Sequence, residues 1–139
     1  MPGLPSLLVA ASAAIVVAFG SLHLFHTFRG RMLFPRDEEL VESMKRTSPR
    51  ITGETTMWRT WIGINATHSM SLILFGLFYG WMALAAPALL FASWFPRLLG
   101  LATLAAFTVL ARRYFFSVPF KGVVAATALY VTGLVAAAL

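Results

Sequence analysis

Four long apolar runs, separated by shorter polar stretches, dominate the pattern of this chain. They extend over residues 6–28, 61–86, 97–116 and 118–139. A helix needs roughly 20 residues, within a range of about 17–25, to cross the hydrocarbon core of a bilayer. The pattern therefore predicts an all-α membrane protein, a single domain folded as a four-transmembrane-helix bundle. The third run is the least clear, because Pro87 and Pro96 bracket an apolar stretch before it that could form a turn or the start of a tilted helix.

The polar stretch between the first two runs contains a shorter helical pattern at residues 36–46. Acidic residues come first and Lys45 and Arg46 come last, an order that suits the helix dipole. Three apolar residues have the spacing of one helix face, and they are Leu40, Val41 and Met44. The pattern predicts a short amphipathic helix in the first cytoplasmic loop, on the membrane surface or against the end of the bundle. Thr55 or Thr56 is the expected N-cap of the second run.

The positions of the basic residues predict an orientation. Ten of the eleven lie between the first two runs (Arg29, Arg31, Arg36, Lys45, Arg46, Arg50 and Arg59) or near the turn between the last two (Arg112, Arg113 and Lys121). Only Arg97 lies between the second and third runs. Loops rich in Lys and Arg stay on the cytoplasmic side. We therefore expect both basic loops in the cytoplasm and both termini outside.

Composition narrows the classes of function. The chain is 59% hydrophobic and 12% charged, with a mean hydropathy of +0.80, which is too apolar for a water-soluble domain of 139 residues. The net charge of +6 does not indicate nucleic acid, because the bases stand at the ends of apolar runs, where they face lipid headgroups. The chain has no cysteine, which excludes disulfides and thiolate metal sites. No acidic residue falls within a run, which argues against a carboxylate proton relay.

Polar side chains gather near the cytoplasmic ends of the first two runs. They are His23, His26 and Thr27 in the first run and Asn65, His68 and Ser69 in the second. Residues three and four apart share a helix face. Since one run approaches the loop and the other leaves it, the two sets should lie at a similar depth. An antiparallel helix pair would let all three histidines of the chain converge.

Three interpretations of this cluster remain open. The side chains could hydrogen-bond across helices, or they could line a polar pocket for a lipid headgroup or organic ligand, to which Arg112 and Arg113 would add charge. The third interpretation is a zinc, copper, iron or haem site ligated by His23, His26 and His68. The predicted ligand-binding residues are therefore His23, His26, Thr27, Asn65, His68, Ser69, Arg112 and Arg113. We predict no catalytic residue.

The favoured function is a non-catalytic integral membrane protein, a binding or accessory subunit. Its histidine- and asparagine-bearing pocket would accept a lipid or small apolar ligand, or contact a partner subunit. Gly76 and Gly80 form a G-x-x-x-G pattern that favours close helix approach, and small-residue faces suit a homo-oligomer or a larger membrane complex. The alternatives are a metal- or haem-binding redox protein and a small transporter. Membrane lipids are expected partners and nucleic acid is not.

One segment resembles a known family. It comprises Arg50-Ile51-Thr52, Thr55-Thr56-Met57-Trp58-Arg59, Trp61-Ile62-Gly63, Asn65, His68-Ser69 and Phe75-Gly76-Leu77, together with the Pro35-Arg36-Asp37 loop. These residues are similar to small, uncharacterised bacterial four-helix membrane proteins. The resemblance implies a multi-pass protein of the bacterial inner membrane and supplies no activity. In size and helix number the chain is also loosely similar to the sterol-isomerase and sigma-2-receptor superfamily, whose lipid cavities use acidic residues that this sequence lacks.

Overall fold

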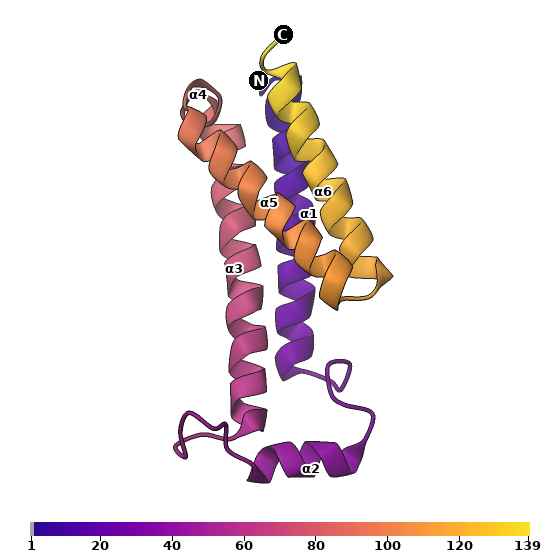
Figure 1. Ribbon diagram of the computed structural model, residues 1–139. Coiled ribbons are helices and arrows are strands. Elements are labelled where there is room, and N and C mark those ends of the chain that lie inside the picture. The colour runs from indigo at the N-terminus through magenta and orange to yellow at the C-terminus, as the bar shows by residue number, and fades with distance from the viewer. Residues whose placement is uncertain (1) are drawn as a thin grey trace. The chain divides into compact units, whose positions relative to one another are not determined.

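The computed structural model describes residues 2–139, which are 80% helical and contain no strands (Figure 1). The helices are α1 (Leu4–Phe28), α2 (Glu38–Arg46), α3 (Met57–Ala85), α4 (Pro87–Ala92), α5 (Trp94–Tyr114) and α6 (Ser117–Ala136). Four of these, α1, α3, α5 and α6, are long and apolar enough to cross a membrane. The prediction of an all-α chain with four such helices is confirmed.

The helices begin and end close to the predicted runs, with two differences. Helix α3 begins at Met57, four residues before the apolar run, because the Thr56 hydroxyl accepts a hydrogen bond from the Arg59 amide at 3.3 Å and caps the helix. Thr55 and Thr56 are the two expected N-caps, and Thr56 is the one that caps the helix. The stretch between Pro87 and Pro96 forms a separate short helix, α4, before α5 begins.

Prolines mark the starts of four helices. Pro5, Pro87, Pro96 and Pro119 each lie within the first three residues of α1, α4, α5 and α6. The first amides of a helix have no carbonyl partner within it, so a residue without an N–H costs nothing there, and its fixed φ favours the helix. The prolines thus separate one continuous apolar sequence into distinct helices.

The described chain forms two compact units. The bundle unit consists of the residues up to Phe19 together with Leu72–Leu139, and the loop unit is Gly20–Ser71. Helices α1 and α3 each contribute one part to each unit. All the buried residues of the main hydrophobic core belong to the bundle unit, including Val9, Met82, Leu104 and Tyr130.

Within the bundle unit, α6 runs antiparallel to the first part of α1 (Figure 1). The Ser12 hydroxyl donates a buried hydrogen bond to the Ala126 carbonyl at 2.7 Å. A Cβ added to Gly133 would come within 2.8 Å of the Val9 side chain and 3.1 Å of the Pro5 carbonyl oxygen. The two backbones therefore approach closely because residue 133 has no side chain.

Two tyrosines fix the start of α5 in the same unit. Tyr79 from α3 donates a hydrogen bond to the Pro96 carbonyl at 2.8 Å, and Tyr130 from α6 donates to the same oxygen at 3.3 Å. The tyrosine rings contact each other edge to face, with centres 5.8 Å apart. Buried tyrosines require a partner for the hydroxyl, and the Pro96 carbonyl is within reach of both, while the Tyr130 hydroxyl also lies 3.2 Å from the Arg97 carbonyl as a second acceptor.

In the loop unit, α1 ends in a turn at Gly30, whose φ of 91° is one that glycine adopts readily. The Asp37 carboxylate accepts hydrogen bonds from the Glu39 and Leu40 amides at 2.9 and 3.4 Å and caps α2. Phe34 and Trp58 then meet edge to face, with ring centres 4.7 Å apart. These contacts tie the long loop to the start of α3.

Candidate functional site

A polar contact between α1 and α3 joins His23 to Asn65. The His23 Nε2 and Asn65 Oδ1 atoms are 2.9 Å apart, and both residues lie in the loop unit. The Asn65 Nδ2 group donates to the Trp61 carbonyl one turn earlier, at 2.8 Å. The structure therefore brings together one predicted site residue from each helix.

These two hydrogen bonds determine which nitrogen of His23 carries a hydrogen. Because the Asn65 amide nitrogen donates to Trp61, the atom facing His23 is the amide oxygen, which can only accept. His23 must then donate from Nε2. That nitrogen has no lone pair left for a metal, so His23 could bind one only through Nδ1.

The other polar residues of the cluster bond mainly within their own helices. The Thr27 hydroxyl donates to the His23 carbonyl at 2.7 Å, and the Ser69 hydroxyl donates to the Asn65 carbonyl at 2.8 Å. Both side chains are buried, at 3% and 0% exposure. They close i→i−4 hydrogen bonds and do not point at a shared ligand. Among residues 2–139, every buried side-chain nitrogen and oxygen has a hydrogen-bond partner.

The three histidines are not equivalent. The His23 and His68 rings meet edge to face with centres 5.4 Å apart, whereas the His26 ring contacts Phe25 of its own helix, centres 5.3 Å apart. In the described part of the chain, no three metal-ligating side chains form a group.

Arg112 and Arg113 belong to the bundle unit, in the last turn of α5. Both side chains are exposed, and the guanidinium carbon of Arg112 lies 5.4 Å from the centre of the Phe120 ring on α6. The contact is a cation–π interaction across the short turn between the two helices. The remaining predicted site residues all lie in the loop unit.

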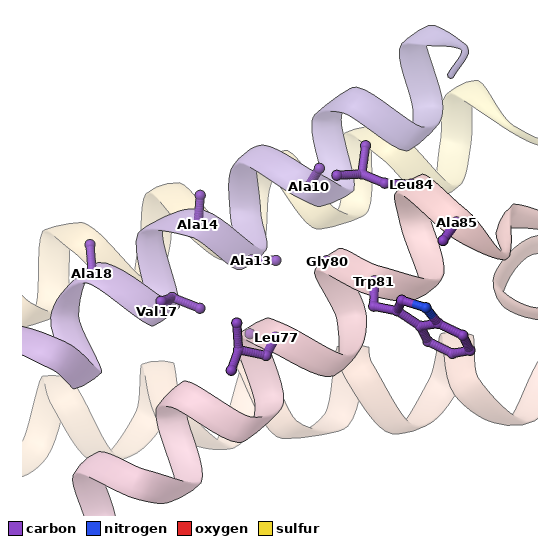
Figure 2. A pocket seen from close by; sticks show the side chains of 11 residues that line it. Ala10, Ala13, Ala14, Val17, Ala18, Leu77, Gly80, Trp81, Leu84 and Ala85 are labelled. Carbon is purple, nitrogen blue, oxygen red and sulfur yellow. The ribbon is translucent and has the colours of Figure 1, made fainter. Parts of the chain in front are cut away.

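A groove of about 590 Å³ lies elsewhere, in the bundle unit. Figure 2 shows its two walls: Ala10, Ala14 and Ala18 on α1, and Leu77, Gly80 and Trp81 on α3. All eleven lining residues are apolar, and none was predicted as a ligand-binding residue.

The sequence contains a signal for this groove. The α1 alanines recur every four residues, at 10, 14 and 18, which places them on one face. The G-x-x-x-G pattern of Gly76 and Gly80 provides the facing wall. Small residues on both helices leave a trough that larger side chains would fill.

Comparison with known protein families, curated proteins and solved structures finds no match for this chain.

Proposed function

We propose that the chain is a four-span integral membrane protein that binds lipid as a non-catalytic binding or accessory subunit. The apolar groove on α1 and α3 would hold an acyl chain. The two basic loops would face the cytoplasm, and α2 would lie as an amphipathic helix at that surface. Kinship with the small bacterial four-helix membrane proteins is part of the same proposal.

Support for the membrane setting comes from the surfaces of the long helices. In the most apolar window of α1, α3, α5 and α6, a third or less of the residues is buried. Large apolar side chains such as Leu74, Phe78 and Val109 are more than half exposed. Contiguous apolar surface on this scale is costly in water and favourable in hydrocarbon.

The observation that carries the binding role is the groove itself. Its volume of about 590 Å³ falls within the range of roughly 300–1,000 Å³ typical of small-molecule sites. The one hydrogen-bonding side-chain group among its lining residues is the indole N–H of Trp81, and the other ten residues are Ala, Gly, Val or Leu, so the chemistry it suits is a hydrocarbon chain. Around an apolar helix pair in a bilayer, acyl chains are the surrounding solvent.

The polar cluster fits a supporting role in this proposal. The hydrogen-bonding groups of His23, Asn65, Thr27 and Ser69 engage one another or the helix backbone. Such bonds join neighbouring helices in lipid. The cluster would hold α1 and α3 together rather than perform chemistry.

The membrane topology can be tested by single-cysteine labelling, since the chain has no cysteine of its own. We expect a membrane-impermeant maleimide to modify Ala138→Cys in intact cells, and Ser48→Cys and Ser117→Cys only after lysis. Release of the protein from membranes by alkaline carbonate would contradict integration. The opposite labelling pattern would contradict the orientation.

The groove is tested by filling it. Ala14→Leu adds a side chain to the groove wall, and Ala105→Leu makes the same change at an exposed alanine of α5 that does not line it. Native mass spectrometry of protein purified in mild detergent should show one lipid fewer on Ala14→Leu than on the wild type or the control. Equal lipid retention by the two variants would contradict acyl-chain binding in the groove.

A further inference from the structure

Three cations flank the turn between α5 and α6 within ten residues of sequence. Arg112 and Arg113 lie in the last turn of α5, two residues connect the helices, and Lys121 lies in the second turn of α6. All three side chains are exposed. We call these three residues the turn cluster.

One of these cations is held in place by an aromatic ring. The guanidinium carbon of Arg112 lies 5.4 Å from the centre of the Phe120 ring, so the end of α5 and the start of α6 contact each other through this pair. A cation over a ring face is attracted by the negative charge of the π-system. The ring limits the conformations of Arg112 and leaves its outer N–H groups available to an anion.

The turn cluster has no acidic partner in its own unit. The bundle unit contains four basic residues, these three and Arg97 at the other end of α5, and no Asp or Glu. Both ion pairs recorded for residues 2–139, Arg31–Glu38 and Lys45–Glu42, lie in the loop unit. The turn therefore carries a local positive charge that no acidic side chain of its own unit neutralises.

The side chains around the cluster indicate the level of the membrane at which it lies. Tyr114 at the end of α5 and Phe115 and Phe116 in the turn itself are exposed. Exposed aromatic residues at helix ends are typical of the interface between hydrocarbon and water. At that level the abundant anion is the phosphate of a lipid headgroup.

We propose that the turn cluster is a binding site for the phosphate of an anionic phospholipid, with Arg112, oriented by Phe120, as its principal ligand. A planar guanidinium offers two parallel N–H groups to phosphate oxygens. Arg113 and Lys121 add charge from either helix. This inference rests on the proposed function, because a headgroup reaches the turn only if the helices cross a bilayer. The proposed function concerns the acyl chain of the bound lipid, and this inference adds the class of its headgroup.

The test compares lipid preference among matched variants. The wild type and the triple variant Arg112→Gln, Arg113→Gln, Lys121→Gln are reconstituted in nanodiscs that contain phosphatidylcholine and phosphatidylglycerol. Lipids that stay bound after release are counted by native mass spectrometry. Each lost cation is expected to reduce the preference for phosphatidylglycerol by about fivefold, so the triple variant should lose about a hundredfold if the three contributions add.

A matched control changes the same number of charges elsewhere. Arg29→Gln, Arg36→Gln and Arg50→Gln alter three exposed arginines of the loop unit that have no recorded ion pair. This control should keep the preference. An equal loss in both triple variants would show that net charge alone attracts the lipid and would overturn the site, as would an unchanged preference in the turn variant.

Two further measurements sharpen the outcome. Phe120→Leu keeps the apolar volume and every charge but removes the ring, and it should weaken the preference about two- to threefold. Millimolar inorganic phosphate should not displace the lipid; displacement would mean that the site takes soluble phosphate and would overturn the lipid assignment.

Carbonate extraction of the same samples separates the two proposals. A wild type that is not integrated refutes the proposed function, whereas integrated protein without a lipid preference refutes only this inference.

Discussion

Helices α1 and α3 are held together by different chemistry in the two units. In the loop unit, the side chains of His23 and Asn65 hydrogen-bond across the helices. In the bundle unit, Gly76 lies so close to α1 that a Cβ would come within 2.7 Å of the Ala13 carbonyl oxygen and 2.6 Å of the Val17 side chain. The contact in the loop unit depends on the His23 and Asn65 side chains, whereas the contact in the bundle unit depends on Gly76 having no side chain.

Helix capping also differs between the two units. In the loop unit, Asp37 and Thr56 cap α2 and α3. In the bundle unit, α4, α5 and α6 begin without a side-chain cap in the described chain. Caps and ion pairs belong to a segment that meets water, whereas close packing of small residues belongs to one that meets lipid. This difference between the units supports the membrane proposal, and substitutions in either unit can test it.

The largest effect is expected at Gly76. Gly76→Val forces a side chain against the α1 backbone, which cannot shift as a flexible side chain does. Overpacking of this kind costs about 1–3 kcal/mol. The free energy of unfolding, measured in mixed micelles with increasing SDS, should fall by that amount.

The control for this change is Gly63→Val on the same helix. A Cβ at Gly63 meets nothing within 4 Å, so we expect a change of less than about 0.5 kcal/mol. An equal loss at both positions would mean that valine weakens the helix itself, and the close α1–α3 contact would not be the cause.

A smaller effect is expected from the cap of α2. Asp37→Ala removes the acceptor of the Glu39 and Leu40 amides and should cost α2 about 1 kcal/mol. Hydrogen exchange over residues 38–46 should accelerate about fivefold, with no change in the bundle unit. Asp37→Asn, which also caps, is the control and should exchange nearly as slowly as the wild type. Faster exchange in the bundle unit would contradict a local effect of the cap on α2.

The sequence predicts the membrane-crossing runs better than the helix ends. Hydropathy measures which residues suit lipid, whereas capping determines where a helix starts. For that reason α3 begins at Met57, although its apolar run starts at residue 61. The α4 segment is too short for a periodic pattern, and only the prolines at 87 and 96 indicate that the chain is divided there.

The polar cluster shows a similar limit. Spacing predicts that polar positions of the first two long helices share a face, and His23 and Asn65 do meet. It does not predict which histidine makes the contact, because His23 and His26 differ by about 60° around the helix axis and only tertiary packing fixes that rotation. The alanine face of α1 can be read from the sequence, but the groove depends on how α3 is placed against it.

The interhelical hydrogen bond should have a smaller effect than the cap. A double-mutant cycle of His23→Ala and Asn65→Ala should give a coupling energy of about 0.6 kcal/mol, and not above roughly 1.7, as for other hydrogen bonds in membranes. His26→Ala with Asn65→Ala is the matched control and should show no coupling. Coupling through His26 instead would contradict the observed pairing.

The smallest effect is expected from the Glu42–Lys45 ion pair, both residues of which lie in α2. The Lys45 ammonium donates a hydrogen bond to the Glu42 carboxylate at 2.7 Å. This contact lowers the pKa of the Glu42 carboxyl below its ordinary value of 4.5. A carboxyl with a depressed folded pKa stabilises the helix above its ordinary pKa, and this contribution disappears as the pH falls through the folded value. NMR chemical shifts of residues 38–46 should therefore report slightly more helix in the wild type than in Glu42→Gln near neutral pH, and the same helix content in acid. Since both side chains are exposed, high salt should remove the difference as well. A difference that survives both acid and salt would show that Glu42 makes a contact other than the pair with Lys45.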